Sequence, residues 1–393
     1  MSPLPRALGA RLSALHASCF LGLGFYLPFF PVWLQSKALG PSVIGIIVAI
    51  PIMVRILVTA PLLALADGPL GPRRLLLASY AGQLVGYPIL LMLDSDVAIA
   101  GMVAVLAVFQ AAVIPANDLV TTIAVRRGPG LHYGRIRGFG SIAFLFASVA
   151  AGYLIDSLGA GIVIWALAVA PLLGLLATHL AVPPNIRPDL PPPAAPASGT
   201  ILPRALWLLI AAAALIQGSH GGLYAFGSIE WRAVGFSDSV IGYFWAIGVV
   251  AEILVFYLLG RGVGRGSAGL GLILLGGAAA AFRWALLAAS PGLWATLALQ
   301  ALHGLSFGAT HLGSMAALAA LAPDKARGRA QGLLGSSIAL AMAAATVLSG
   351  FLYRISGTTL FAAMAPLGAA AVALVLLAMR DLRNHPQRAG EGG

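Results

Sequence analysis

The stretch W-L-Q-S-K-A-L-G-P-S-V-I-G-I, from Trp33 to Ile46, returns in the second half of the 393-residue chain. The second copy reads W-R-A-V-G-F-S-D-S-V-I-G-Y, from Trp231 to Tyr243. The repeat unit is half of a protein, whereas the repeats of solenoid proteins are much shorter. The chain is therefore predicted to contain two related halves that arose by duplication.

The composition is that of an integral membrane protein. Hydrophobic residues make up 60% of the chain, charged residues 9%, and the mean hydropathy is +0.96. This excludes a soluble globule, in which roughly 25% of the residues are charged. Apolar segments of roughly 20 residues, long enough to cross a bilayer as helices, follow one another from end to end. We predict an all-α polytopic fold of twelve transmembrane helices in two six-helix pseudo-repeats, at residues 10–34, 41–66, 73–93, 97–124, 138–157, 160–181, 204–229, 239–260, 267–290, 292–321, 328–353 and 357–380.

The net charge of +11 reflects membrane topology. Most of the 23 lysines and arginines lie at the termini or in the loops that follow every second predicted membrane segment, which are all on one side of the membrane. Only Lys37, Arg232 and Arg354 lie on the other side. Because basic residues favour cytoplasmic loops, both termini and the central loop are predicted to be cytoplasmic in a bacterial-type inner membrane. The basicity therefore implies no nucleic-acid partner.

A proline-rich segment separates the two halves. We predict an N-terminal six-helix half at 1–182, a cytoplasmic linker at 183–203, and a C-terminal half at 204–393 that ends in a short cytoplasmic tail. A linker of this composition stays extended and buries no core. Two like halves in a membrane chain suggest a transporter with its site between them.

Several kinds of chemistry are excluded. Cys19 is the only cysteine, so the chain has neither an intrachain disulfide nor a cysteine-based metal cluster. No H-E-x-x-H, Walker or G-x-S-x-G motif occurs in the sequence. We expect no enzyme activity, no cofactor and no metal, and an ATP-driven pump is disfavoured.

Ionisable residues inside the predicted spans are candidates for function. A charge at the bilayer centre costs roughly 2.5–3.5 kcal/mol on insertion scales, so each needs a partner or a role. The predicted segment 204–229 carries Gln217, His220 and Tyr224, which share one face and are predicted to line a substrate cavity. In a regular α-helix, His303 and His311 of the predicted segment 292–321 would be about 80° apart around the helix axis and need not face the same way. The ionisable candidates are Arg55, Asp118, Glu252, Arg283, His303 and His311.

The turn L-A-D-G-P-L-G-P-R-R, from Leu65 to Arg74, resembles the signature of the major facilitator superfamily. In that signature an acid is followed by glycine and a basic pair, and Asp67, Gly71, Arg73 and Arg74 match it. Two inserted prolines depart from the pattern, and the corresponding turn of the second half, G-R-G-V-G-R-G, lacks the acid. The resemblance implies that these four residues latch one conformation; the alternative is an ordinary basic turn.

Longer stretches are similar to the 3-phenylpropionate permease family, which belongs to that superfamily and is related to the lactose/proton symporters. They are G-S-H-G-G-L-Y-A-F-G-S-I-E-W from Gly218, G-Y-F-W-A-I-G-V-V-A-E from Gly242, and Y-G-R-I-R-G-F-G-S-I-A-F from Tyr133. The resemblance implies the major facilitator fold and proton-coupled uptake of a small organic solute such as an aromatic carboxylate. The expected partners are that solute, a proton and the lipid bilayer, and we expect a monomer.

The same resemblance implies roles in substrate binding. It pairs Asp118, which follows Pro-Ala, with Arg137, the second arginine of G-R-I-R, and places the ring of Phe144 on the ligand. In the alternative interpretation, Asp118 only neutralises Arg137 or Arg55.

Proton coupling is assigned by resemblance to Glu252, Arg283 and His303. The family's glutamate three residues after the histidine is Ser306 here. A coupled carrier needs a group whose pKa crosses ambient pH, so Glu252 or His303 would take that role alone. A static Glu252–Arg283 pair and histidines bound to helix backbones remain alternatives.

Other functions stay open. An arginine with aromatic neighbours suits an aromatic acid, but Asp118 and Arg137 equally suit sugar hydroxyls, as in a sugar or nucleoside/proton symporter. A drug or metabolite exporter of this superfamily often carries a proline-rich fifth helix, and no proline lies between Gly138 and Asp156. An intramembrane enzyme or receptor would need a catalytic constellation that the sequence does not show.

Overall fold

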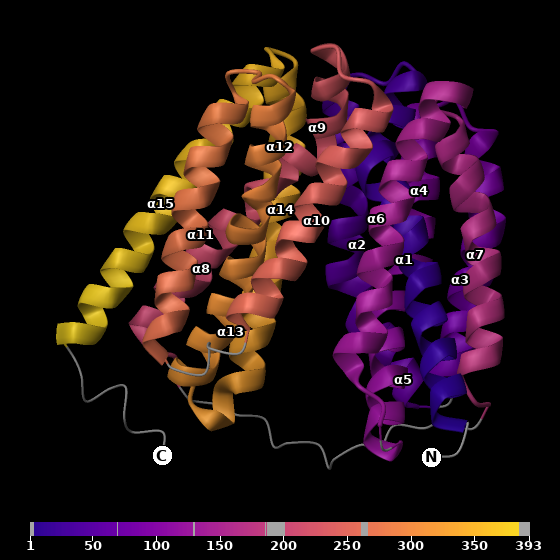
Figure 1. Ribbon diagram of the computed structural model, residues 1–393, viewed down its shortest axis with the longest axis horizontal. Coiled ribbons are helices and arrows are strands. Elements are labelled where there is room, and N and C mark those ends of the chain that lie inside the picture. The colour runs from indigo at the N-terminus through magenta and orange to yellow at the C-terminus, as the bar shows by residue number, and fades with distance from the viewer. Residues whose placement is uncertain are drawn as a thin grey trace. The chain divides into compact units, whose positions relative to one another are not determined.

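The computed structural model describes residues 4–68, 70–128, 130–184, 186, 201–260 and 266–384 (Figure 1). Regular secondary structure in these ranges is helical. The helices are α1 (Leu4–Ser36), α2 (Pro41–Asp67), α3 (Gly71–Leu91), α4 (Asp96–Ala111), α5 (Val113–Arg127), α6 (Tyr133–Leu158), α7 (Ile162–Ala181), α8 (Arg204–Gly218), α9 (His220–Ala233), α10 (Asp238–Leu259), α11 (Gly266–Leu287), α12 (Leu293–Ala301), η1 (Gly304–Ala309), α13 (Thr310–Leu321), η2 (Asp324–Ala326), α14 (Arg327–Tyr353) and α15 (Gly357–Asn384).

All twelve predicted membrane segments are helical. Within the described ranges, 11 segments are long and apolar enough to cross a membrane. The remaining predicted segment, 73–93, is α3, in which Arg73, Arg74 and Gln83 lower the hydropathy. Three segments are interrupted, because α4 gives way to α5 at Ala112, α8 to α9 at Ser219, and α12 passes through η1 into α13.

The chain forms two compact units. Unit 1 comprises Met1–Pro193 and Trp231–Ala246, and unit 2 comprises Ala194–Glu230 and Ile247–Gly393. The ends of α9 and α10 that flank their connecting turn therefore belong to unit 1. Most of the predicted linker, the glycine- and arginine-rich turn at 261–265 and the predicted C-terminal tail from 385 lie outside the described residues. The predicted division into 1–182, 183–203 and 204–393 stays a prediction.

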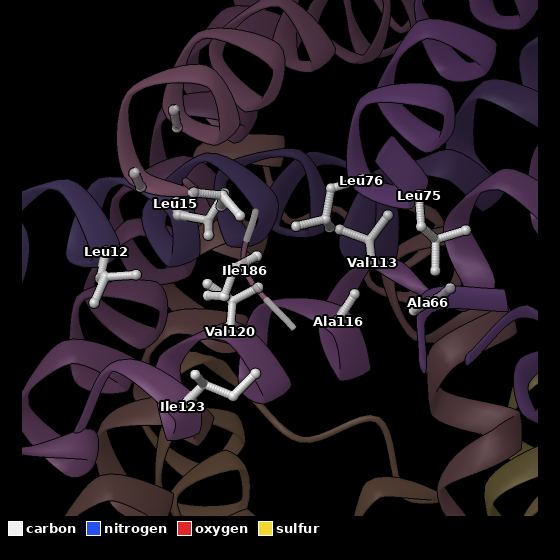
Figure 2. Close-up of a cluster of buried hydrophobic side chains, with 14 of the residues drawn as sticks. Leu12, Leu15, Ala66, Leu75, Leu76, Val113, Ala116, Val120, Ile123 and Ile186 are labelled. Atoms are coloured by element: carbon white, nitrogen blue, oxygen red, sulfur yellow. The ribbon is translucent and has the colours of Figure 1, made fainter. Parts of the chain in front are cut away.

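In unit 1, α1 packs against α6 and α7, and α3 packs against α7. Figure 2 shows the buried apolar side chains that α1, α3 and α5 bring together, among them Leu12, Leu76 and Val120. In a bilayer such contacts stabilise mainly by van der Waals packing, because lipid tails are as apolar as leucine. This core positions the N-terminal half of α5, which carries Asp118.

The second copy of the duplicated motif docks on α6 within unit 1. Both backbone N–H groups at the start of α10 are capped by one carboxylate: Asp238 N donates to Asp156 Oδ1 at 2.9 Å and Ser239 N to Asp156 Oδ2 at 3.0 Å. Tyr153 and Tyr243 are joined through their hydroxyls at 3.1 Å. We call Trp231–Ala246 the 231–246 segment.

The backbones of α6 and the 231–246 segment touch because both helices have glycine at the crossing. A Cβ atom on Gly152 would lie 2.7 Å from the carbonyl carbon of Asp238, and one on Gly242 would lie 2.6 Å from the carbonyl oxygen of Ser148. Such distances are shorter than real Cβ contacts, so neither position tolerates a side chain without movement of the backbone.

Candidate functional site

In unit 2, the membrane segment that contains α12 and α13 is interrupted by a π-helical turn, η1. His303 immediately precedes this turn, and the buried Ser306 lies inside it. A π-helical turn is rare and is frequently found at functional sites. The predicted histidine therefore lies at an irregular point of a helix that is otherwise regular.

The three residues predicted to handle protons form a row in unit 2. Arg283 of α11 donates through Nη1 to His303 Nδ1 at 3.4 Å. On the other side of the ring, His303 Nε2 lies 3.8 Å from Oε2 of Glu252 in α10. Arg283 is fully buried, whereas the side chains of His303 and Glu252 are 12% and 23% exposed. The imidazole ring thus lies between a buried guanidinium and a more accessible carboxylate.

The predicted cavity-lining stripe packs onto η1. Gln217 Nε2 donates to the carbonyl oxygen of Phe307 at 3.3 Å, and His220 Nε2 lies 3.1 Å from Ser306 Oγ. Gln217 and His220 are buried, and Tyr224, one turn further along α9, is partly buried. Gln217 and His220 therefore both contact η1 in unit 2, and the lining of a substrate cavity by these residues and Tyr224 stays a prediction.

Polar residues that the sequence analysis did not assign complete this network. Arg283 Nη2 donates to Gln300 Oε1, and Arg283 Nη1 lies 3.4 Å from Ser306 Oγ. Trp284 Nε1 donates to Ser219 Oγ at 2.8 Å, at the break between α8 and α9. A polar residue at every third position (300, 303 and 306) in an otherwise apolar segment was the signal that could have identified them.

Both histidines of the interrupted segment face α10. His303 contacts Glu252, and the His311 ring lies 6.1 Å from that of Phe256, one turn further along α10. A regular helix would separate the two histidines by about 80°. The extra residue in the π-helical turn rotates the next part of the helix by about 100°, which brings the two histidines back to nearly the same side.

Unit 1 contains the predicted substrate pair. Asp118 Oδ1 accepts a hydrogen bond from the Tyr133 hydroxyl at 2.9 Å and lies 3.5 Å from Arg137 Nε. The side chains of Arg137 and Asp118 are 29% and 34% exposed. The pair is therefore accessible, and Tyr133 is a third member that the sequence analysis missed.

The aromatic ring that packs on Arg137 is Phe20 of α1, whose centroid lies 4.2 Å from the guanidinium carbon. Phe144, the ring that the family resemblance places on the ligand, is buried in unit 1 with 5% of its surface exposed. Phe20 lies on a different helix, so spacing within one helix could not reveal it.

Arg55 is exposed near the middle of α2 and forms no ion pair in the described part of the chain. The ion-pair partner of Asp118 is Arg137, which answers the alternative that Asp118 neutralises Arg55. Among the described residues, Arg55 therefore has no carboxylate as an ion-pair partner.

The four predicted latch residues lie at the junction of α2 and α3. Asp67 ends α2, and Gly71 begins α3 with a φ of 75°, a value that favours glycine. Arg73 donates to the carbonyl oxygen of Val182 at 2.8 Å and lies 3.0 Å from His179 Nδ1, at the end of α7. Arg74 is exposed. Arg73 therefore holds α3 to α7 inside unit 1, and the latch role stays a prediction.

Residues 10–363 match the model of the MFS_1 like family, and this range includes both polar clusters. The chain belongs to the MFS_1 like family. As a member, it is a multi-pass membrane transporter of the major facilitator type. The family resemblance drawn from the turn at Asp67 and from the longer motifs is confirmed.

Two relatives of this MFS_1 like chain are similar over nearly their whole length. A protein of Escherichia coli (strain K12), described as a probable 3-phenylpropionic acid transporter, is 29% identical over 376 residues, which cover 88% of this chain and 91% of the relative. The maltose permease of Geobacillus stearothermophilus is 26% identical over 375 residues, which cover 92% of each chain.

Solved structures confirm the major facilitator fold. The nucleoside transporter NupG superposes with a TM-score of 0.75 at 14% identity, covering 96% of this MFS_1 like chain and 99% of NupG. A peptide transporter, POT, superposes with a TM-score of 0.71 at 13% identity, covering 98% of this chain and 95% of POT. Likeness at these identities concerns the fold alone.

Proposed function

We propose that this transporter takes up a small organic solute together with a proton, by alternating access, across a bacterial-type inner membrane with both termini cytoplasmic. The substrate class we propose is an aromatic carboxylate resembling 3-phenylpropionate. The observation that carries the proposal is the contact between Glu252 and His303 inside membrane-spanning segments. Ionisable residues are costly there and mark proton pathways. The relative named for 3-phenylpropionic acid supports the substrate class.

Glu252 is the proton carrier in this proposal. It is the acid of the row and the more exposed end, so it can exchange a proton with solvent. His303 Nδ1 faces an N–H donor of Arg283, which leaves the ring proton on Nε2, directed at Glu252. His303 therefore orients the carboxylate, and Arg283 orients His303.

We further propose a division between the two halves. The N-terminal half, 1–182, supplies the substrate pair Asp118 and Arg137, and the C-terminal half, 204–393, supplies the proton row. The linker at 183–203 joins them. The latch at Asp67 and the lining role of Tyr224 belong to the same proposal, as does a monomeric state.

A transport assay in liposomes tests the proposed function. A charge that moves down 100 mV releases roughly 2.3 kcal/mol, enough for about a fiftyfold solute gradient. A monoanion carried with one proton is electroneutral, so only the pH gradient should drive it. We expect labelled 3-phenylpropionate to accumulate when the outside is acidic, and a potassium diffusion potential alone to have no effect. Equilibration without accumulation under either gradient would contradict the proposal.

A sugar is the second candidate substrate. The maltose permease relative and the exposed Asp118–Arg137 pair, which suits hydroxyl groups, favour it. Maltose is neutral, so its symport with a proton moves net charge. Accumulation of labelled maltose driven by voltage in the same liposomes would select the sugar and reject the carboxylate. Net outward movement of the substrate, driven by protons that move inward down their gradient, would instead identify an exporter.

The Asp118–Arg137 pair provides a prediction for either substrate. We expect Asp118→Asn to lower uptake about 10- to 100-fold, because a hydrogen bond to a charged group is lost, with little change in thermal stability for a partly exposed pair. Initial rates of uptake over a range of substrate concentrations measure the effect. Exchanging the two charges, with Asp118→Arg and Arg137→Asp together, is the control. Restored uptake in the exchanged variant would show that the pair only neutralises itself.

A further inference from the structure

Arg283 is a fully buried charge whose partners are all neutral. Its guanidinium contacts Gln300 Oε1, His303 Nδ1 and Ser306 Oγ, and its Nε is buried with no hydrogen-bond partner. Within the described ranges, no carboxylate forms an ion pair with it. A buried charge without a counter-ion is strongly destabilising, and inside a membrane it is rare. The fold therefore keeps a cation for which it supplies no direct anion.

The neighbouring histidines do not change this balance. His220 Nδ1 faces the carbonyl oxygen of Ile216 at 3.0 Å and must carry the proton, so its Nε2 accepts from the Ser306 hydroxyl. His303 accepts from Arg283 and directs its own proton at Glu252. One proton on each ring satisfies these contacts, so neither ring has to carry a charge to make them. Glu252 is on the far side of the His303 ring, with Oε2 3.8 Å from Nε2.

The donors left open on Arg283 match a carboxylate. Nη1 faces two acceptors, Nη2 one and Nε none, so Nε–H and the second Nη2–H are both free. A carboxylate accepts from two such parallel N–H groups at once. The Trp284 ring lies 4.5 Å from the guanidinium carbon, and the Phe307 ring is stacked on His303 at 5.1 Å. These apolar walls lower the local dielectric and strengthen an ion pair formed there.

We propose that Arg283 binds the carboxylate of a monoanionic substrate with an apolar body, and that this carboxylate supplies the missing counter-charge. This inference rests on the proposed function and names the group that holds the acid end of its substrate. It assigns Arg283 a direct contact with substrate, in addition to its place beside His303.

Binding to the purified full-length chain tests the inference. The probes are 3-phenylpropionate and its uncharged amide, whose affinities are measured by isothermal titration calorimetry. We expect the acid to bind about 10- to 100-fold more tightly than the amide, as one charge-assisted interaction provides. Arg283→Gln should remove this preference. Arg55→Gln, which removes an arginine with no ion pair in the described chain, is the matched control and should retain it.

A second variant tests the charge argument without removing the arginine. Ser306→Glu would place a permanent carboxylate beside Arg283, because Ser306 Oγ is already 3.4 Å from Nη1. We expect it to abolish the preference for the acid. Ser306→Gln adds similar bulk without charge, so it should affect acid and amide alike and preserve their ratio. Circular dichroism melting of each variant shows that it is folded.

The outcomes separate the inference from the proposed function. The inference is wrong if the wild type does not prefer the acid over the amide, or if this preference survives in Arg283→Gln or Ser306→Glu. It is also wrong if the preference is lost in Arg55→Gln instead. These outcomes count against the inference even where liposomes accumulate the acid. If the preference depends on Arg283 but no pH gradient drives uptake, the inference holds and the proton-coupled function fails.

Discussion

Glu252→Gln is expected to abolish accumulation driven by a pH gradient. Glutamine has nearly the shape of glutamate and its amide oxygen can still accept from His303, but it cannot carry a proton. The inside-to-outside ratio of labelled 3-phenylpropionate should therefore fall to about 1, while exchange of labelled for unlabelled substrate continues, because exchange requires no net proton movement. Steady-state accumulation and counterflow in the same liposomes measure the two activities.

The control for this prediction is Asp96→Asn, which removes an exposed acid at the first turn of α4. It should accumulate substrate as the wild type does. If Glu252→Gln still concentrates substrate when the outside is acidic, the proton is carried elsewhere and the row is a structural pair. If both accumulation and exchange are lost, Glu252 holds the substrate as well as the proton.

Gly152→Leu is expected to displace the 231–246 segment from α6 and to eliminate transport. A leucine side chain cannot fit where a Cβ atom alone would lie 2.7 Å from the Asp238 carbonyl carbon. Overpacking commonly costs about 1–3 kcal/mol, and here the neighbour is backbone, which cannot move aside as a side chain does. Displacement would also remove Asp156 from the first N–H groups of α10, a cap worth about 0.5–2 kcal/mol.

Thiol labelling can detect this displacement. Cys19 is the only cysteine of the chain, so a Cys19→Ser background with Ala246→Cys carries a single reporter. Ala246 is 6% exposed, and we expect maleimide to label the reporter at least tenfold faster when Gly152→Leu is added. Gly138→Leu on the same helix is the matched control, since a Cβ atom there meets nothing within 4 Å. Unchanged labelling together with normal uptake in Gly152→Leu would contradict the prediction.

The helices of this transporter were readable from the sequence because length and hydropathy are local properties. The interruptions at Ala112, Ser219 and η1 were not predicted. The break at Ser219 coincides with a hydrogen bond from Trp284, which lies more than sixty residues away and outside any short sequence window around Ser219. The break at Ala112 does have a local signal, because Pro115 has no N–H to donate to the carbonyl oxygen of Ala111. That oxygen accepts instead from the Thr59 hydroxyl at 3.5 Å.

The candidate site was predictable in its charged residues and less so in their neighbours. The cost of burying charge singled out Asp118, Glu252 and Arg283 individually. Which ring packs on Arg137 depends on how α1 packs against α6, so the contact with Phe20 could not be predicted from the sequence of α6 alone. Likewise, the spacing of Gln217 and His220 predicted a common face correctly but could not show that η1 covers it.

The π-helical turn η1 has a consequence for mutational studies of this protein. Its effect depends on how many residues separate His303 from Thr310, and every single substitution leaves that number unchanged. Deletion of one residue from Gly304–Ala309 would restore a regular helix and turn all of α13 by about 100°, moving His311 away from Phe256 while leaving the composition almost intact. A library of insertions and deletions would therefore probe a property of this transporter that a substitution scan cannot sample.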